Sequence, residues 1–591
     1  MQVIATAGHV DHGKSTLVKA LTGADPDRLA EERRRGLSIE LGYAWTELGP
    51  VGEVAFVDVP GHEKFLRTML SGIGPVPAAL LVVAADDPWM PQAAEHLAAL
   101  DALGVAHAVV AVTRCDLADP GPMLARARTE VDRTSLAGAA VVAVSAVTGD
   151  GLDDLRAALV ALVADLPTPS ADADVRLWVD RSFTVRGAGT VVTGTLPAGT
   201  VRVGDRLTAV TGAGTGTVRV RGVQALSRPR DAVSGVARAA LNVVSEERLA
   251  LDRDAVLVTP DAWRLTTTVD VRLSPDGPDL PGQGVLHLGA VAVPVRVRPF
   301  DDAHVRLTLA RPLPLRIGDR ALLRDPGSRR LWGARVLDPA PPQLRRRGAG
   351  ARRGRELAAS TGTGNLDAEL ARRGLASADL LRRIGVPLPP GTDDWLISPE
   401  AAALVQARML DAVKRWDDAH PLDPGMPVPA LARALELPVP GLVTRLLAEP
   451  LRLVDGKVTA AAPRPGLPDD VERAVRAVEQ DLAAAPFAAP TAERLATLGL
   501  HRKAVAVAAR AGRLLDLGGG IVLLPGADRT ALIQLAELPQ PFTTSQARQR
   551  LDTSRRVVLP LLAHLDRTGG TVRHPDDRRS VVLPRAGREH D

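Results

Sequence analysis

The chain has very little of three features that many proteins depend on. Of its 591 residues one is cysteine, Cys115, so no disulfide can form within the chain, which fits a reducing compartment. Only 2% of the residues are aromatic, so RNA bases have few rings to stack on, while arginine contacts to phosphates and base edges stay available. Because no run of about 18 uncharged apolar residues occurs, we expect no transmembrane helix and no membrane partner.

The first residues also lack the pattern of a secretory signal peptide, since they already have the apolar character of a buried strand. Together with the single cysteine, this predicts a cytoplasmic protein, which we expect to be monomeric. The length predicts about four domains, and a hydrophobic content of 46% is enough to build their cores.

Residues 1–168 alternate short apolar runs with helical patterns. This order is typical of a doubly wound α/β domain with a mostly parallel sheet. A proline-bearing connection, 164–174, follows. From residue 174 to 340 runs rich in valine and threonine alternate with polar residues and are interrupted by glycine, which predicts two β-barrel domains, 174–258 and 259–340.

The segment 339–356 carries a run of arginines. Two interpretations of it stay open, a solvated connector or a contact with ribosomal or transfer RNA. Beyond it, helical patterns followed by short β-like segments recur about every 60 residues, which predicts winged-helix modules. We place modules 1 and 2 in 341–465, module 3 in 466–528 and module 4 in 529–591.

The stretch "GHVDHGKST" fits the phosphate-binding pattern G-x-x-x-x-G-K-[ST], and it lies between a predicted strand and a predicted helix. In such a loop, backbone N–H groups surround phosphate oxygens, the lysine neutralises the β- and γ-phosphates, and the serine hydroxyl binds Mg²⁺. The sequence therefore predicts a nucleotide site made of Gly8, His9, Val10, Asp11, His12, Gly13, Lys14, Ser15 and Thr16.

A second motif, "DVPGH", follows another predicted strand. Asp58 is placed to hold Mg²⁺ through water, as an acid at this position does in phosphate-loop enzymes. Gly61 can donate its backbone N–H to a γ-phosphate, and His62 follows directly, placed to orient an attacking water.

The choice of base is predicted from "TRCD" and "SA". The carboxylate of Asp116 can accept hydrogen bonds from guanine N1–H and its exocyclic amine, a pattern that adenine does not offer. The predicted base site, which favours GTP over ATP, comprises Thr113, Arg114, Asp116, Ser145 and Ala146.

These motifs resemble those of the translational GTPases, the group that contains elongation factor Tu. The resemblance implies that His62 is the catalytic histidine and that GTP and GDP are bound with Mg²⁺. It also implies that Ser38 binds Mg²⁺ together with Ser15 and Asp58, although the family usually has threonine at the position of Ser38. Arg114 departs from the lysine usual in the family, which affects nucleotide affinity rather than the chemistry.

Within that group the chain resembles the SelB family, the bacterial selenocysteine-specific elongation factors. The resemblance rests on "RGLSIELGYAW", "WMPQAAEHLAAL", "VDRSFTVRGAGTVVTGTL" and "TSRRVVLPLLAHLDRTGGTVR". It implies a pocket that separates an anionic selenol from the neutral serine hydroxyl by fixed positive charge. Asp180, Arg181 and Arg238 match the pocket positions; the alternative is that Asp180 and Arg181 merely form an ion pair of the barrel.

The last module carries many arginines, as phosphate contact requires. The resemblance implies that it reads an mRNA stem-loop of the SECIS type, through Arg548, Ser554, Arg555, Arg567 and Arg573. The alternative is a solvated arginine-rich surface.

The sequence thus predicts a GTPase that brings selenocysteyl-tRNA to the ribosome at UGA codons marked by an mRNA hairpin. Three alternatives stay open. These are a general aminoacyl-tRNA carrier, a factor resembling the carrier of initiator tRNA, and an RNA-binding regulator that does not hydrolyse GTP.

Overall fold

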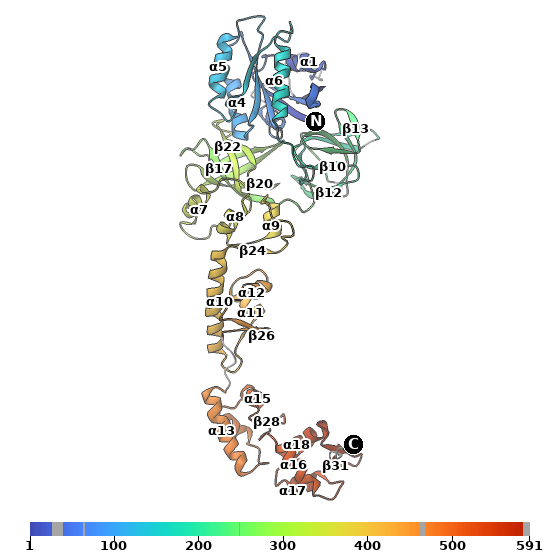
Figure 1. The fold of residues 1–591 in the computed structure, drawn as a ribbon, viewed down its shortest axis with the longest axis vertical. Helices are drawn as coiled ribbons and strands as arrows, with labels where there is room; N and C mark the ends of the chain where they lie inside the picture. Colours follow the sequence, from blue (N-terminus) through green and yellow to red (C-terminus); the bar gives the residue numbers. More distant parts are fainter. Residues whose placement is uncertain (27–39, 63–64, 188, 248, 461–466, 583–591) are drawn as a thin grey trace, which may run out of the picture. The chain divides into compact units, whose positions relative to one another are not determined.

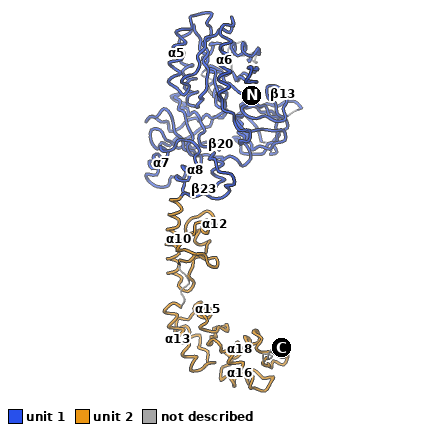
Figure 2. The backbone as a smooth tube through the Cα atoms, in the orientation of Figure 1, with its two compact units in different colours: residues 1–398 blue, residues 399–591 orange. Residues whose placement is uncertain are grey.

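The computed structural model describes residues 1–26, 40–62, 65–187, 189–247, 249–460 and 467–582 (Figure 1). The chain divides into two compact units, residues 1–398 and 399–591 (Figure 2). Among the helices of these ranges, none has both the length and the apolar content needed to cross a bilayer.

Unit 1 begins with a six-stranded sheet in the order β2-β3-β1-β4-β5-β6. All neighbouring strands run parallel except β2 and β3. The strands are β1 (Gln2–Ala7), β2 (Gly42–Glu47), β3 (Glu53–Asp58), β4 (Ala78–Ala84), β5 (His107–Thr113) and β6 (Ala140–Ala143).

Helices cover both faces of this sheet, because the central strands are apolar on both sides. One core lies between the sheet and α3 (Leu66–Ile73), α4 (Pro91–Leu103) and α5 (Gly121–Val131). The other core lies beneath α1 (Lys14–Thr22) and α6 (Leu152–Ala164). The predicted doubly wound α/β domain is confirmed, and its candidate site residues follow the carboxyl ends of β1, β3, β5 and β6.

The next segment forms a sheet that wraps around a single apolar core. Its hydrogen-bonded order is β7-β16-β11-β12-β15-β9-β8, and β13 pairs with β12. These strands are β7 (Arg176–Trp178), β8 (Arg181–Val185), β9 (Gly189–Leu196), β11 (Arg206–Thr211), β12 (Gly214–Ala225), β13 (Arg228–Arg230), β15 (Ala237–Ser245) and β16 (Val256–Val258); β10 (Thr200–Arg202) pairs with β14 (Ala232–Ser234).

Six further strands close into a barrel in the order β17-β20-β19-β18-β21-β22. Their inward valines and leucines form a core of their own. The strands are β17 (Leu265–Ser274), β18 (Gln283–Leu288), β19 (Val291–Pro299), β20 (His304–Pro314), β21 (Arg320–Arg324) and β22 (Leu331–Asp338).

Unit 1 ends with a small helical module whose two short strands pair with each other. Its elements are α7 (Ala349–Ala358), α8 (Leu366–Arg373), β23 (Leu375–Ser377), α9 (Ala378–Arg383) and β24 (Trp395–Ile397). The division at 398/399 therefore falls inside the predicted segment 341–465 and separates module 1 from module 2.

Unit 2 repeats a helical group followed by a short hairpin. Module 2 contains α10 (Pro399–Ala419), β25 (Met426–Pro427), α11 (Val428–Ala434), α12 (Gly441–Arg445), β26 (Arg452–Val454) and β27 (Lys457–Thr459). Module 3 contains α13 (Asp469–Ala484), α14 (Ala492–Thr497), α15 (Arg502–Arg510), β28 (Leu515–Asp516) and β29 (Val522–Leu523).

Module 4 contains α16 (Ala527–Ala536), α17 (Thr544–Arg550), α18 (Arg555–Arg567), β30 (Thr571–Arg573) and β31 (Arg579–Val581). Because α16 begins at Ala527, it crosses the predicted boundary at 528/529. Modules 3 and 4 share one apolar core, so they pack as a pair.

Candidate nucleotide, aminoacyl and RNA sites

The loop between β1 and α1 is folded tightly around Lys14. The Lys14 ammonium donates to the carbonyl oxygens of Gly8 and His9, at 3.2 and 2.7 Å. Gly8 has φ of 133°, and a Cβ there would lie 2.1 Å from the carbonyl oxygen of Val82, so only glycine fits. Gly13 precedes α1 in the left-handed region, with φ of 80°. This is the backbone that a phosphate-binding loop requires.

Asp58 lies at the end of β3 and is fully buried. Its carboxylate accepts hydrogen bonds from the hydroxyls of Thr6 and Ser15, both at 2.6 Å. Among the residues that the structure describes, no cluster of three or more His, Cys, Asp and Glu side chains could hold a metal by itself. The oxygens of Ser15 and Asp58 nevertheless fit Mg²⁺, which takes few protein ligands and completes its shell with water and phosphate.

Gly61 packs directly against the phosphate loop. A Cβ at this position would lie 2.6 Å from the backbone nitrogen of Val10 and 2.7 Å from Nζ of Lys14, so the close approach depends on glycine. His62 follows, partly exposed, with its ring edge-on to Phe65 at 6.1 Å between centroids. Gly61, the predicted γ-phosphate donor, thus lies at the phosphate loop with His62 next to it in the chain, whereas Ser38 lies outside the described residues.

The candidate base site joins three loops. Ser145 donates its hydroxyl to Asp116 at 2.6 Å, and that hydroxyl also accepts the backbone N–H groups of Val147 and Thr148. Ala146 follows, half-buried. Thr113 donates to the carbonyl oxygen of His12 at 2.8 Å. The segment of Ser145 and Ala146 therefore holds the Asp116 carboxylate, and the same segment is predicted to contact the base.

Arg114 connects the base site to the phosphate loop. Its guanidinium contacts Asp86 at 3.1 Å and donates to the carbonyl oxygen of Asp11. Asp11 and Arg114 both have positive φ, 64° and 58°. An arginine at this position thus bridges the two nucleotide loops, a geometry that the sequence pattern did not reveal.

One buried histidine, His12, belongs to the phosphate loop, and another, His96 of α4, contacts the loop. Burial, with the neighbouring His9 and Lys14, lowers the pKa of His12 to about 4. Burial likewise lowers the pKa of His96 to about 3, so its ring is neutral, and Nδ1 accepts the backbone N–H of Gly8 at 2.8 Å. His96 was missed as a site residue, although it lies within "MPQAAEHL".

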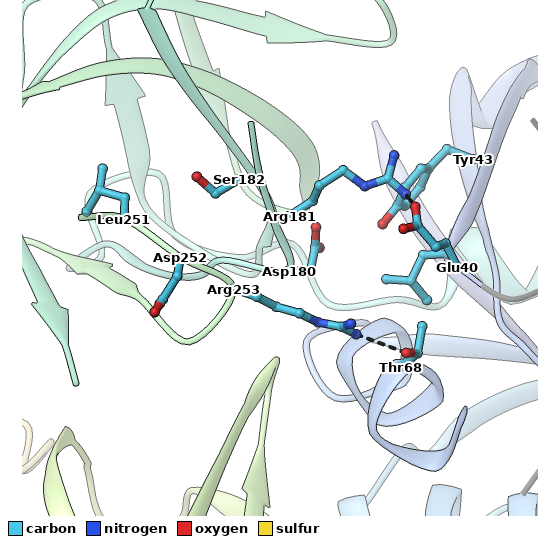
Figure 3. Close-up of a pocket in the computed structure, with 10 residues that line it drawn as sticks. Glu40, Tyr43, Thr68, Asp180, Arg181, Ser182, Leu251, Asp252 and Arg253 are labelled. Carbon is cyan, nitrogen blue, oxygen red and sulfur yellow. Dashed lines mark hydrogen bonds and ion pairs between the residues drawn. The ribbon is translucent and has the colours of Figure 1, made fainter. Parts of the chain in front are cut away.

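A pocket of about 350 Å³ lies between the α/β domain and the sheet domain that follows it (Figure 3). Polar and charged side chains dominate its wall. The lining residues are Glu40, Leu41, Tyr43, Thr68, Asp180, Arg181, Ser182, Leu251, Asp252 and Arg253.

Asp180 and Arg181, which the sequence suggested as a possible ion pair, each pair with a different residue. Arg181 pairs with Glu40 at 2.5 Å (Figure 3), and Asp180 pairs with Arg238 instead. The Arg238 guanidinium lies over the Tyr43 ring, 4.1 Å from its centroid. Although burial alone would lower the pKa of Arg238, Asp180 and Tyr43 raise it, so this arginine stays charged behind the pocket wall.

Arg253 is a pocket residue that the sequence did not reveal, because nothing in the loop after β15 distinguishes it. It donates to the Thr68 hydroxyl of α3 at 3.0 Å (Figure 3). No carboxylate of the described residues forms an ion pair with it, and its buried Nε has no hydrogen-bond partner. Burial and the nearby Arg67 lower its pKa. The pocket therefore contains a guanidinium group that forms no direct ion pair with a carboxylate of the described residues, although Asp180 and Glu40 lie near enough to oppose the fall of its pKa.

Two arginines of module 4 make structural contacts, although one of them, Arg556, is exposed. Arg579 is buried against Asp566 at 3.0 Å, and Arg556 donates to the carbonyl oxygens of Ala489 and Pro490. The predicted RNA contacts Arg548, Ser554, Arg555, Arg567 and Arg573 are all exposed.

Three of these predicted contacts lie at or near the start of α18. Ser554 precedes the helix and makes no side-chain cap. Arg548 and Arg555 have no partner among the residues described. Arg573 on β30, in contrast, contacts Asp577 at 2.9 Å. The first turn of α18 is thus the part of module 4 best suited to accept a phosphate.

Comparison with protein families gives two matches. Residues 1–165 match the elongation factor Tu GTP binding domain, and residues 533–580 match the winged helix of elongation factor SelB. These segments are therefore a GTP-binding domain of the elongation factor Tu type and a winged helix of the SelB type.

Among curated relatives, the chain is 41% identical over 353 residues to the selenocysteine-specific elongation factor of Escherichia coli (strain K12). That match covers 58% of this chain and 56% of the relative. It is 35% identical over 399 residues to the corresponding factor of Desulfomicrobium baculatum, covering 64% and 62%. The chain thus spans about three-fifths of these relatives, and its resemblance to selenocysteine-specific elongation factors is confirmed.

Solved structures agree on the fold. The crystal structure of a bacterial selenocysteine-specific elongation factor, EF-Sec, matches 99% of this chain and all of that chain, with a TM-score of 0.68 at 24% identity. SelB from Methanococcus maripaludis, in complex with a GTP analogue, matches 58% of this chain and 79% of that chain, with a TM-score of 0.50 at 22% identity. The predicted order of an α/β GTPase domain, two β-barrel-type domains and winged helices is confirmed.

Proposed function

We propose that the protein is a cytoplasmic GTPase that delivers selenocysteyl-tRNA to the ribosomal A site. It acts at UGA codons marked by an mRNA stem-loop and hydrolyses GTP to GDP. One observation carries the proposal. A guanine-nucleotide site and a pocket that contains Arg181 and Arg253 beside three acidic residues are linked through α3, which begins four residues after His62 and supplies Thr68 to the pocket.

The nucleotide is held by the backbone of Gly8 to Ser15 and by the ammonium of Lys14. Asp116 accepts from the guanine edge, while Ser145 fixes its carboxylate. Ser15 and Asp58 would hold Mg²⁺, with Ser38 joining them in the GTP state. When bound, this ion neutralises charge on the β- and γ-phosphates.

His62 orients the attacking water once the ribosome has recognised the codon. Gly61 senses the γ-phosphate through its backbone N–H, because it already packs against Val10 and Lys14. Loss of the γ-phosphate frees this contact, which releases the segments around Ser38 and Gly61 and lowers affinity for the tRNA.

The pocket selects the aminoacyl group by charge. A selenol is ionised at neutral pH, whereas the serine hydroxyl is neutral, so fixed positive charge favours the selenol. Arg181 and Arg238 supply this charge, and Asp180 holds Arg238 in place. Arg253 adds positive charge at the wall formed with α3.

Module 4 supplies the second specificity element, since UGA is otherwise a stop codon. Arg548, Ser554 and Arg555 contact hairpin phosphates at the start of α18, and Arg567 and Arg573 extend the basic surface along the helix and the hairpin. The comparisons with initiation factor 2 subunit gamma, 36% identical in Thermococcus kodakarensis, cover only 34% of this chain. The basic module and the arginine pocket favour the selenocysteine-specific role over an initiator-tRNA or general carrier.

Protection of the aminoacyl ester tests the proposal. The purified protein with GTP is mixed with selenocysteyl-tRNA or with the same tRNA carrying serine, and spontaneous deacylation is followed. We expect the selenocysteyl ester alone to be strongly protected. Equal protection of both esters would indicate a carrier that recognises the tRNA body. Protection of neither would favour the RNA-binding regulator.

A further inference from the structure

Five exposed arginines surround the start of α7. They are Arg345, Arg346 and Arg347 before the helix, and Arg352 and Arg355 on it. We refer to them as the α7 arginine surface. Residues 339–355 contain no Asp or Glu, while the whole chain has a net charge of only +4. Positive charge is thus concentrated locally.

The segment that carries this surface is fixed to the barrel domain. Arg306 of β20 donates to the carbonyl oxygen of Pro342 at 2.9 Å, and Arg373 of α8 donates to that of Ala340 at 3.0 Å. The segment is therefore not the loose connector that its composition allowed.

A sixth arginine of the segment, Arg353, anchors α7 from below. It is 2% exposed and contacts Asp270 of β17 at 2.8 Å and Asp338 of β22 at 2.5 Å. Burial by itself would raise the pKa of Asp338, yet Arg372, Arg373 and Arg353 hold it at about 2. The anchor stays ionised at any physiological pH, so the helix is held rigidly with its other arginines outward.

Few carboxylates of the described residues form ion pairs with these exposed arginines. Glu356 lies 3.8 Å from Arg352, but it also contacts the buried Arg353 at 3.2 Å. Arg346, Arg347 and Arg355 form no ion pair with any carboxylate of the described residues. A rigid surface of uncompensated guanidinium groups favours a polyanion.

We propose that the α7 arginine surface binds the sugar-phosphate backbone of RNA, as a contact separate from the aminoacyl pocket and from module 4. The proposal rests on the proposed function and extends it. The surface offers no aromatic or aliphatic anchor of the kind that protein interfaces use. It also lacks the exposed apolar face that an interfacial membrane helix needs, because Leu357 is buried. Arginine matches phosphate oxygens through paired N–H donors.

The test uses the full-length protein and two probes, an unacylated tRNA transcript and vacant ribosomes. Affinity is measured between 50 and 200 mM salt for the wild type and for R345Q/R346Q/R347Q. Each lost phosphate contact makes the negative slope of log affinity against log salt less steep by about 0.9. If three contacts are lost, the fall in affinity between 50 and 200 mM salt should be about 40-fold smaller than in the wild type.

Two variants serve as controls. R126Q/R128Q/R133Q removes three exposed arginines at and just beyond α5 and should leave the slope unchanged. R345K/R346K/R347K keeps the charge and should keep most of the slope. A reduced slope with tRNA identifies tRNA as the source of the phosphates, and a reduced slope with ribosomes identifies ribosomal RNA.

An unchanged slope with both probes would overturn the proposal, as would an equal loss in the α5 control. Selenocysteyl-tRNA protection is measured on the same proteins. Should protection be absent in the wild type while the slope still depends on the arginines, the proposed function fails and the RNA surface stands.

Discussion

The backbone N–H of Gly8 donates to Nδ1 of His96 across 2.8 Å, which joins the phosphate loop to α4. Both groups are buried, so neither can exchange its partner for water. A buried N–H left without an acceptor costs about 1–3 kcal/mol. His96 is therefore a positioning residue for the loop, although its sequence position gives no sign of contact with it.

His96→Leu should weaken GDP binding about tenfold or more, because the Gly8 N–H loses its acceptor. His96→Gln supplies an oxygen acceptor and should retain more of the affinity. Titration with a fluorescent GDP analogue measures both. A lower melting temperature with unchanged GDP affinity would show that His96 only fills the core.

Acid should destabilise unit 1 through its buried histidines. The pKa values of His12, His96 and His287 are lowered from 6.5 to about 4, 3 and 4 by burial. Between pH 6.5 and these values, the unfolded chain binds more protons than the folded one, so stability falls as pH decreases. Each histidine contributes up to about 1.4 kcal/mol per pH unit in this window.

Urea unfolding at pH 7 and pH 5 measures this effect. His96→Gln removes one titrating group and should show a smaller loss of stability between the two pH values than the wild type. An equal loss in both proteins would mean that other groups set the acid sensitivity.

His62→Ala should leave GTP and tRNA binding unchanged while lowering ribosome-stimulated hydrolysis by about 10²–10⁴-fold. The reason is that the imidazole is expected to act on the water rather than on the bound phosphates. Single-turnover hydrolysis with programmed ribosomes measures the loss. Normal stimulated turnover would remove His62 from its catalytic role.

Asp116→Asn should change the preferred nucleotide from GTP to xanthosine triphosphate. Ser145 donates to Oδ1 of Asp116, so the asparagine oxygen can keep this contact and leave its amide N–H for the base edge. That donor matches the carbonyl of xanthine and opposes the amine of guanine. Competition between the two nucleotides gives the result, and retained GTP preference would contradict the assignment of Asp116.

The local motifs predicted the nucleotide site well, because a phosphate loop is built from consecutive residues whose backbone does the binding. Contacts between residues far apart in the sequence could not be predicted in this way. Asp180, in the bend before β8, pairs with Arg238 of β15 rather than with its neighbour Arg181. Arg253 reaches Thr68 of α3 only through packing between two domains, and His96 reaches Gly8 only through packing of α4 against the sheet of its own domain.

The two predicted selenol-binding arginines differ in their surroundings, so substituting them should change stability by different amounts. Arg181 pairs with Glu40, and both side chains are more than a third exposed. Arg181→Gln should therefore cost at most about 1 kcal/mol of stability. The Asp180 side chain is only 3% exposed, so Arg238→Gln leaves a buried carboxylate unpaired and should cost about 3–5 kcal/mol.

A double variant then distinguishes the effect of Arg238 on stability from its effect on amino acid discrimination. Adding Asp180→Asn to Arg238→Gln removes the unpaired charge and should recover most of the stability in thermal unfolding, because a neutral pair replaces the ionic one. The double variant should still protect selenocysteyl-tRNA and seryl-tRNA more equally than the wild type, since the positive charge of Arg238 remains absent. Full recovery of discrimination together with stability would mean that Arg238 supports the pocket wall and that the selenol is recognised by Arg181 or Arg253.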